Sequence, residues 1–410
     1  MAPPRLLTFS TLFPNAERPN HGIFVENRLR HLLATGEAVA TVLAPVPYFP
    51  FASRYFGDWA RHARVSGRET RHGLAIHHPR YPVLPRVGMS VAPWLLYRAS
   101  LPLARRLMAE QTFDLIDAHY VYPDGVAAVW LGAALGLPVV ITARGSDVTQ
   151  LPDYAVPRRL IRMALGRAAG VIGVSEALRA RVVELGADPA RAVTLRNGID
   201  TAMFHPPADR ASARAALGLT RPTLISVGGL IERKRHHLTI DAMRLLPEME
   251  LLIVGEGPER AALQARIDAA NLSDRVRLLG PVPHAALPAY YGAADASVLA
   301  SSREGWANVL LESMACGTPV LASDITGNPE VVRAPEAGLI LRANTAEGIA
   351  EAARALFADP PDRAATRRYA EAFGWEETSR GQLVLFRRVL GLMPWPADAG
   401  ADPGRSAPAT

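Results

Sequence analysis

Short apolar runs of strand length alternate with segments of helical spacing along nearly the whole chain. In the first half, strands are predicted at 6–10, 39–44, 74–78, 114–118, 139–142, 171–174 and 193–196. Helices are predicted between them at 23–33, 93–110, 126–135, 158–168 and 176–185. The second half repeats the scheme, with strands at 223–227, 250–254, 276–279, 296–299, 320–322 and 339–341. This alternation predicts the α/β class, with parallel sheets that carry helices on both faces.

The length of the chain indicates two domains. A chain of 410 residues with 49% apolar content exceeds a single hydrophobic core. The proline- and alanine-rich stretch 204–212 is the natural hinge, so the domains are placed at 1–205 and 206–374. The amphipathic segment 375–391 is expected to form a final helix. The tail 392–410, rich in Ala, Pro, Gly and Asp, is expected to be disordered.

A strand-to-helix turn near residue 304 has the features of an anion site. Glu304 follows the apolar run 296–299, and helical spacing begins at Asn308. Gly305 lets the backbone approach a ligand closely. The first N–H groups of a helix lack intrahelical partners and favour negative charge, and here they belong to Trp306, Ala307, Asn308 and Val309.

A second carboxylate, Glu312, follows Glu304 by eight residues and lies about a turn into the same helix. Carboxylates accept hydrogen bonds from hydroxyl groups, whereas helix-start amides hold phosphate. The segment is therefore suited to a ligand that carries both phosphate and sugar. Two solvated acids at a helix end are the alternative interpretation.

Lys234 is the only lysine among 45 basic residues. It lies in Gly228-Gly229-Leu230-Ile231-Glu232-Arg233-Lys234-Arg235, a glycine loop between the strand 223–227 and the next helix. Such a loop is suited to phosphate. The alternative is a surface lysine without a role.

Composition narrows the class of protein and its partners. The formal net charge of +6 comes mostly from arginines spread along the chain, and no reading motif or clustered basic face indicates a nucleic-acid partner. An anionic membrane surface is the better anionic partner, and the stretch from Trp94 to Arg106 could rest on lipid headgroups. A half-buried helix of the first domain is the simpler interpretation of that stretch.

The remaining features predict a cytoplasmic protein that can lie at the inner face of the membrane. No signal peptide is expected, because the first five residues lead directly into a strand. The uncharged run 126–143 approaches the length of a membrane span, but Gly136 and Pro138 divide it into a buried helix and a strand. The single cysteine, Cys316, excludes an internal disulfide. Because the chain has no Asp-x-Asp motif or His/Asp cluster, no metal site and no cofactor are expected.

The Glu-x7-Glu pattern, followed by Ser-Met-Ala-Cys-Gly-Thr-Pro-Val at 313–320, closely resembles the donor-binding signature of glycosyltransferase family 4 (glycosyl transferases group 1). This resemblance covers nearly the whole chain before the tail. It implies the GT-B architecture, in which two Rossmann-like, doubly wound domains face a cleft and the last helix crosses back onto the first domain.

The resemblance also implies roles for the residues in these motifs. Lys234 and an arginine would clamp the donor diphosphate, Glu304 would order the sugar hydroxyls, and Glu312 would take the ribose. The family places the arginine where this chain has Gly229. Either Arg233 or Arg235 therefore supplies the second charge, or the clamp depends on Lys234 and the amides.

Further motifs resemble those of the family at corresponding positions. His119, in Asp-Ala-His-Tyr at 117–120, would reach the donor sugar, and Arg144 replaces a histidine in a turn that faces the cleft. Gly22 and Gly255 would let the backbone approach the sugar-phosphate and the nucleotide. The backbone at Val282 would contact the base.

The function implied is a retaining, metal-independent hexosyltransferase of envelope glycan biosynthesis. It would move a sugar from a nucleotide diphosphate sugar to a lipid-linked, polysaccharide or other glycan acceptor. A nucleotide-sugar epimerase on the same fold and a non-catalytic subunit that binds nucleotide sugars or glycans are the alternatives. The base, the sugar, the acceptor and the linkage stay open.

Overall fold

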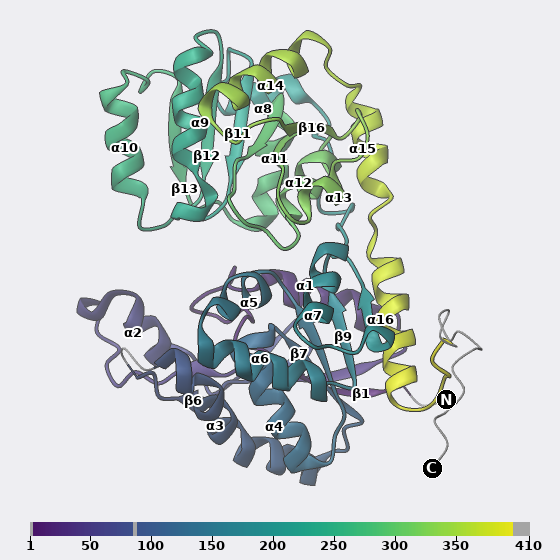
Figure 1. Ribbon diagram of the computed structural model, residues 1–410. Coiled ribbons are helices and arrows are strands. Elements are labelled where there is room, and N and C mark those ends of the chain that lie inside the picture. The colour runs from purple at the N-terminus through teal and green to yellow at the C-terminus, as the bar shows by residue number, and fades with distance from the viewer. Residues whose placement is uncertain (1–2, 85–87, 397–410) are drawn as a thin grey trace.

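The computed structural model describes residues 3–84 and 88–396, which form two α/β domains joined by two connections (Figure 1). The expected disorder of 397–410 lies outside the described residues. Residue Trp395, in the first part of the tail, packs against the N-terminal domain, where the Arg191 guanidinium lies 5.9 Å from its ring centroid.

The N-terminal domain contains an eight-stranded sheet with the order β10-β9-β8-β7-β1-β2-β5-β4. Its strands are β1 (Arg5–Phe9), β2 (Val39–Leu43), β4 (Arg68–Arg71), β5 (Leu74–His77), β7 (Leu115–His119), β8 (Val139–Ala143), β9 (Gly170–Gly173) and β10 (Ala192–Thr194). All neighbours pair in parallel except β4, which runs antiparallel to β5. The expectation of purely parallel sheets is therefore wrong at this edge, where the tight turn at His72 and Gly73 closes a hairpin.

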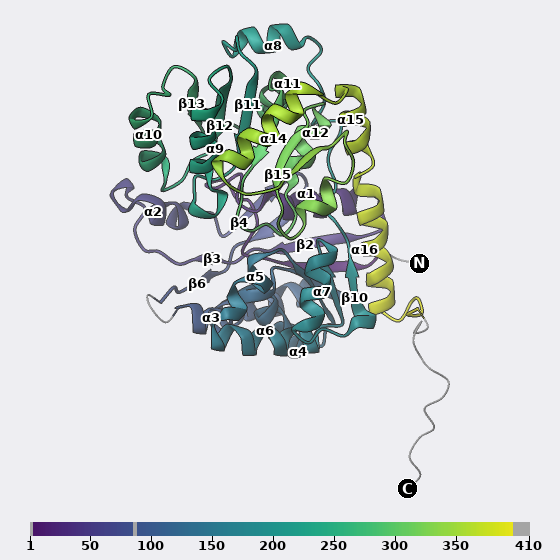
Figure 2. The same cartoon turned by 45° about the horizontal axis from the view of Figure 1, so that its top comes forward.

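The helices of this domain cover both faces of the sheet (Figure 2). They are α1 (Ile23–Ala34), α2 (Gly57–Arg64), α3 (Gly88–Glu110), α4 (Val126–Leu135), α5 (Ser146–Thr149), α6 (Ala155–Arg167) and α7 (Glu176–Glu184), with short helical turns η1 (Arg54–Phe56), η2 (Val121–Gly125), η3 (Leu151–Asp153) and η4 (Pro189–Arg191). The predicted division of the uncharged run is confirmed, because α4 ends before Gly136 and β8 follows. Sequence patterns did not predict α2 or the short pair β3 (Val46–Pro47) and β6 (Arg80–Tyr81).

The C-terminal domain contains a six-stranded parallel sheet with the order β13-β12-β11-β14-β15-β16. Its strands are β11 (Thr223–Val227), β12 (Glu250–Val254), β13 (Val276–Gly280), β14 (Ala296–Leu299), β15 (Val320–Ser323) and β16 (Gly338–Leu341). Its helices are α8 (Arg210–Ala216), α9 (His236–Ala242), α10 (Arg260–Ala269), α11 (Leu287–Ala293), α12 (Asn308–Ala315), α13 (Asn328–Val331), α14 (Ala346–Ala358) and α15 (Arg363–Glu371), with turns η5 (Glu232–Lys234), η6 (Met243–Leu245) and η7 (His284–Ala286). The order changes direction at β11, so ligands are expected at the carboxyl ends of its strands.

The last helix, α16 (Trp375–Val389), returns to the N-terminal domain along one side of the molecule (Figure 1). The Trp375 ring stacks on His31 of α1 at 5.1 Å between centroids. Leu383 and Phe386 are buried in a core cluster that contains Leu6 and Leu29. In the described part of the chain, no helix is both long and apolar enough to cross a membrane.

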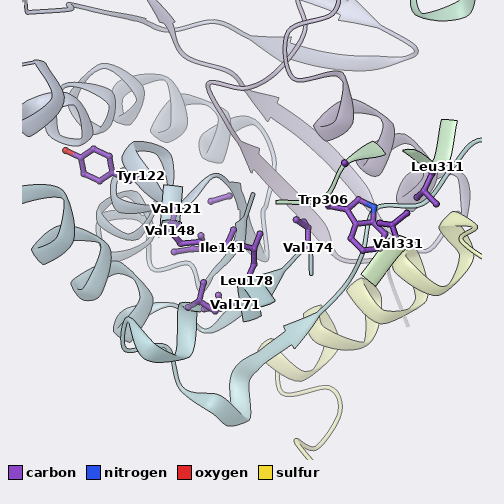
Figure 3. Close-up of a cluster of buried hydrophobic side chains, with 14 of the residues drawn as sticks. Val121, Tyr122, Ile141, Val148, Val171, Val174, Leu178, Trp306, Leu311 and Val331 are labelled. Atoms are coloured by element: carbon purple, nitrogen blue, oxygen red, sulfur yellow. The ribbon is translucent and has the colours of Figure 1, made fainter. Parts of the chain in front are cut away.

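The two domains are in direct contact beside the cleft. One apolar cluster includes Ile141 and Val174 of the N-terminal domain together with Trp306 and Val331 of the C-terminal domain (Figure 3). The Glu330 carboxylate accepts hydrogen bonds from two backbone N–H groups at the start of α7, at 3.0 and 3.1 Å, and pairs with Arg196 at 2.6 Å. These contacts hold the domains in a closed arrangement.

Candidate active site

A cavity of about 430 Å³ lies between the domains, within the range of about 300–1,000 Å³ for small-molecule sites. From the N-terminal domain it is lined by segments that follow β1, β7, β8, β9 and β10: Leu12, Phe24, Tyr120, Arg144, Gly145, Ser146, Thr149, Gln150, Val174 and Asn197. From the C-terminal domain it is lined by Arg233, Lys234 and the segment 303–309. The cavity thus lies where the carboxyl ends of two parallel sheets meet.

Lys234 and Glu304 form an ion pair on the cavity wall. The Lys234 Nζ lies 2.6 Å from Glu304 Oε1, and Arg233 contacts the other carboxylate oxygen at 3.3 Å. Ser301 Oγ donates a further hydrogen bond at 2.8 Å. Burial alone would raise the pKa of Glu304, but the charges of Lys234 and Arg233 outweigh it and the pKa is lowered. The carboxylate is therefore ionised between two cations.

The loop after β11 shows which arginine accompanies Lys234. Arg233 lines the cavity with Lys234. Arg235 has a left-handed conformation with φ of 50°, precedes α9, and is absent from the cavity wall. Arg233 is therefore the arginine that adds charge beside Lys234.

The segment Gly305 to Val309 lines the cavity, and α12 begins within it at Asn308. The four amides chosen from the sequence are thus brought together at a helix start beside Lys234. Gly305 has a role beyond the expected close approach of the backbone to a ligand. A Cβ there would lie 2.0 Å from the carbonyl oxygen of Arg144 and 3.0 Å from Gly145 Cα. Glycine at 305 is required because the backbones of the two domains meet there.

Glu312 is not on the wall of this cavity. It is 8% exposed and pairs with His284 Nε2 at 3.1 Å, and it accepts a hydrogen bond from the Tyr291 hydroxyl at 3.3 Å. Burial lowers the pKa of His284, but the Glu312 carboxylate outweighs this effect and the pKa is raised. Glu312, His284 and Asn308 line a smaller hollow behind the start of α12.

His119 also differs from its expected place, because it is 1% exposed and does not line the cavity. The Arg144 guanidinium, which does line it, donates to His119 Nδ1 at 2.7 Å. Since arginine is always a donor, Nδ1 accepts, and Nε2 carries the proton donated to Asp117 Oδ2 at 3.1 Å. Burial lowers the pKa of His119, which agrees with this neutral form. His119 orients Arg144 and does not itself face the cavity.

This contact belongs to a buried polar network that reaches three parts of the chain. Asp117 also accepts a bond of 3.3 Å from Gln382 of α16. Arg144 donates to Asn197 Oδ1 at 3.0 Å, and Asn197 donates to the Asn308 side chain at 3.3 Å. Burial and the nearby charge of Arg28 lower the pKa of Arg144 to about 9. The network joins the crossover helix to the helix start that faces the cavity.

Three other predicted residues lie outside the cavity wall. Gly22 has φ of 70°, and a Cβ would lie 2.3 Å from the carbonyl oxygen of Leu12, so it shapes the loop that carries Leu12 and Phe24. At Gly255 a Cβ would lie 1.9 Å from the carbonyl oxygen of Gly228. Val282 is half-buried against the core.

Several residues on the cavity wall were not predicted. The Tyr120 hydroxyl lies 2.6 Å from Ser146 Oγ, and the Arg144 guanidinium lies 5.2 Å from the Phe24 ring centroid. The positions after strands 114–118 and 139–142 could have indicated Tyr120 and Ser146. Within residues 3–84 and 88–396, no group of three or more His, Cys, Asp or Glu side chains could hold a metal ion.

Two family descriptions match the chain in succession. "Glycosyltransferase Family 4" matches residues 24–203, and "Glycosyl transferases group 1" matches residues 209–373.

Curated relatives cover most of the chain. A candidate teichuronic acid biosynthesis glycosyltransferase of Bacillus subtilis is 26% identical over 356 residues, which are 85% of this chain and 88% of that protein. A D-inositol 3-phosphate glycosyltransferase of Kineococcus radiotolerans is 29% identical over 385 residues, with coverages of 82% and 85%.

Among solved structures, sucrose-phosphate synthase from Thermosynechococcus elongatus matches with a TM-score of 0.77. The match covers 95% of this chain and 100% of that chain at 23% identity. At this identity the likeness establishes the fold, a pair of Rossmann-like domains in the GT-B arrangement.

Proposed function

Because this chain belongs to the glycosyl transferases group 1 of glycosyltransferase family 4, we propose that it transfers a sugar from a nucleotide diphosphate sugar to a glycan or lipid-linked acceptor. We further propose that the sugar keeps its anomeric configuration and that no metal ion takes part. The observation that most directly supports this proposal is that Lys234, Arg233 and the start of α12 lie around one cavity.

The cavity wall supports a donor with a diphosphate. Lys234 and Arg233 supply cationic donors from one side, and the helix-start amides of 306–309 supply neutral donors with a favourable dipole from the other. Charge that develops on a leaving diphosphate would be stabilised by groups already in place, which is the role a divalent cation has in other transferases.

The Glu304 carboxylate competes with the donor diphosphate for Lys234 and Arg233. In this structure Glu304 already neutralises Lys234 at 2.6 Å. An arriving diphosphate would share Lys234 and Arg233 with the carboxylate, which then accepts hydrogen bonds from sugar hydroxyls. Glu304 thereby keeps the two cations in position before the donor arrives.

The N-terminal domain supplies Arg144 and Tyr120 on the facing wall. We assign Arg144 to contact with the donor sugar or its phosphate, oriented through His119 and Asn197. Glu312 reaches a nucleotide only from the hollow behind α12, so its proposed contact with the ribose requires the nucleoside to occupy the side of His284.

The acceptor is proposed to be an envelope glycan intermediate at the inner face of the membrane. Of the two relatives, one is named for teichuronic acid biosynthesis, which supports a glycan acceptor. The other is named for D-inositol 3-phosphate, which does not, so the relatives leave the acceptor unidentified.

The test begins with the donor. UDP-, GDP-, ADP- and dTDP-sugars are compared by thermal shift, since a ligand at 100 times its Kd adds about 2.7 kcal/mol of stability. With the selected donor, nucleotide release is measured with and without glycan acceptors in excess EDTA, and the product of an α-linked donor is examined by NMR. Retained activity and an α-linked product are expected. Activity restored only by magnesium or manganese refutes metal independence, and a β-linked product refutes retention.

Glu304→Ala gives a second test of the donor site. Loss of a charge-assisted contact costs roughly 1.5–3 kcal/mol, so transfer should fall by about one to two orders of magnitude. An unaltered rate in this variant would remove Glu304 from the mechanism.

A further inference from the structure

The net positive charge of the chain is concentrated in residues 48–110. Arginines occur throughout the sequence, but acidic residues are scarce in this segment, which has ten arginines and three Asp or Glu. Its formal charge is therefore +7, whereas the whole chain carries +6 and the remainder carries −1. The segment follows β3 and contains η1, α2, β4, β5, β6 and α3 at one edge of the N-terminal domain. The arginines are dispersed along the sequence, but the net charge is local.

The same segment carries most of the exposed apolar side chains. Among the described residues, fourteen large hydrophobic side chains are exposed, and nine of them lie between Tyr48 and Trp94. Soluble proteins rarely expose such a concentration of apolar side chains without a partner.

Five of the nine are aromatic residues on the lobe formed by η1 and α2: Tyr48, Phe51, Tyr55, Phe56 and Trp59. Phe49 holds this group together, with ring centroids 5.5 Å from Phe56 and 5.8 Å from Trp59. Tyr55 is 91% exposed. The lobe thus exposes aromatic rings to solvent, and their packing around Phe49 holds them in place.

The other four are Val83, Leu84, Met89 and Trp94, which lie after β6 and along the start of α3. Three of them line an apolar hollow of about 370 Å³: Val83, Leu84 and Met89. Trp94, Arg98 and Arg105 follow one another on the same face of α3 because they are four and seven residues apart. Arg98 lies 5.9 Å from the centroid of the Trp94 ring.

The two groups belong to one surface, which we call the docking face. The Arg80 guanidinium of β6 donates to the carbonyls of His62 in α2 and of Val65 after it. The Tyr48 amide donates to the Tyr81 carbonyl at 2.7 Å. Both views show α2, β6 and the start of α3 at the edge of the molecule opposite α16 (Figures 1 and 2).

We propose that the docking face binds the surface of an anionic membrane. Aromatic rings and arginines are the side chains that suit the boundary between headgroups and acyl chains. The charge of the segment complements anionic lipid. Nucleic acid would stack on the aromatic residues but offers nothing to the aliphatic group at Val83, Leu84 and Met89.

The docking face is connected to the active-site cavity through η2. Tyr120, just before η2, lines the cavity, and the Tyr122 hydroxyl donates to the Met89 carbonyl at the start of α3. A bilayer on the docking face would therefore lie beside the N-terminal wall of the cavity. The reason for docking, delivery of a lipid-linked acceptor, rests on the proposed function, but docking itself does not.

Vesicle cosedimentation of the full chain tests this inference separately from activity. The probes are phosphatidylcholine vesicles with and without about 30 mol% phosphatidylglycerol. We expect binding to the anionic vesicles at low salt and a loss of at least tenfold at about 1 M NaCl, where the screening length is about 3 Å. Equal binding to both vesicles, or no binding to either, overturns the proposal.

Two double variants divide the apolar from the charged contribution. Tyr55→Ser with Trp94→Ser, and Arg98→Glu with Arg105→Glu, should each weaken binding to anionic vesicles at least tenfold. Matched controls in the C-terminal domain are Leu245→Ser and the pair Arg244→Glu with Arg342→Glu, which change exposed side chains of the same kinds. These controls should bind normally, and equal loss in them would show a nonspecific charge effect and overturn the proposal.

Two further readouts exclude other occupants. Donor hydrolysis without vesicles should be unchanged in the docking variants, because the substituted residues lie outside the cavity. A wild-type protein that binds vesicles but shows no transfer would refute the proposed function and leave the docking proposal standing. Sedimentation velocity should show a monomer at all concentrations. A dimer that the Tyr55 and Trp94 substitutions dissociate, or preferential binding to a single-stranded oligonucleotide, would assign the face to another partner.

Discussion

The Nζ atom of Lys234 lies 2.6 Å from a carboxylate oxygen of Glu304, and this pair connects the two segments of the C-terminal domain that we propose to bind phosphate. Lys234 ends η5 after β11, whereas Glu304 lies between β14 and α12. Because β11 and β14 are neighbouring parallel strands, their carboxyl ends bring the two loops to one edge of the sheet. A single strand pairing thus brings together the proposed donor site from segments that are 70 residues apart in the sequence.

Substitution of Lys234 should remove most transfer without unfolding the protein. Lys234→Ala removes a compact charge from the cavity wall, and Lys234→Arg replaces it with a wider planar group, so both should lower the transfer rate by at least tenfold. Arg235→Gln is the control, because Arg235 lies in the same loop but outside the cavity wall. Lys234 is also the only side-chain amine, so saturating nucleoside diphosphate should protect it from amine-selective labelling. If labelling is equal with and without nucleotide, and the Lys234→Ala variant is fully active, Lys234 is a surface lysine without a role in the site.

Gly305→Ala should force the domains apart. The new Cβ would lie 2.0 Å from the Arg144 carbonyl oxygen of the other domain, which is far inside contact distance. We expect a larger radius of gyration by small-angle X-ray scattering and at least a tenfold lower transfer rate. Gly67→Ala is the control, since a Cβ there meets no atom within 4 Å. An unchanged radius of gyration together with full activity would show that the closed contact is dispensable.

Arg144 and Gln382 test the buried network from its two ends. Arg144→Lys cannot maintain both the 2.7 Å bond to His119 and the 3.0 Å bond to Asn197, so kcat should fall at least tenfold. Gln382→Met leaves Arg28 without an acceptor in α16 and should cost about 1–3 kcal/mol of stability. If Gln382 acts through Arg144, its variant also lowers kcat with little change in KM. A loss of stability with normal kcat would restrict Gln382 to a structural role.

The Glu312–His284 pair should make stability depend on pH. Because the pKa of folded His284 is raised above its ordinary value of 6.5, the pair stabilises the fold fully below about pH 6.5 and loses this contribution as pH rises through the raised pKa. His284→Gln should flatten this part of the stability profile in urea denaturation. Glu312→Gln should do the same and also weaken binding of the free nucleoside diphosphate. Normal nucleotide affinity would place Glu312 outside the donor site.

Asp124 should give a dependence of the same sign at lower pH. Burial raises its pKa from 3.8 to about 7, although Thr11 donates two hydrogen bonds to it. Between these values the folded protein holds a proton that the unfolded chain has released, so stability falls as pH rises from about 4 to about 7. Asp124→Asn should remove this fall, which amounts to at most about 4 kcal/mol. Asp153→Asn, at an exposed acid, is the control, and an identical profile for wild type and Asp124→Asn would contradict the buried neutral carboxyl.

Sequence periodicity predicted the main strands because buried parallel strands are continuous apolar runs, such as β12 and β14. It did not predict β3 and β6, which are two residues long, or α2, whose face is largely exposed. The strands β3 and β6 are too short to show a period, and α2 was missed because it has only eight residues and few of them are apolar.

For the candidate site, the sequence predicted where the loops lie better than it predicted which side chains pair. The loops at Lys234 and Glu304 follow strands, and strand order alone places them together. The neighbours of His119 and Glu312 could not be deduced, because Gln382 lies 265 residues from Asp117 and His284 lies 28 residues from Glu312. The packing around the glycines could not be deduced for a related reason. A sequence shows where a side chain is missing but not which backbone occupies the space, as at Gly22, Gly255 and Gly305.

The return of α16 to the first domain sets an order for folding during synthesis. The apolar surface around Leu6 and Leu29 is completed by Leu383 and Phe386, which the ribosome adds more than 350 residues later. The N-terminal domain therefore emerges with an uncovered hydrophobic surface that stays open while the entire second domain is made. A nascent chain released before residue 375 would leave that surface exposed to chaperones or to aggregation, even with both sheets already formed.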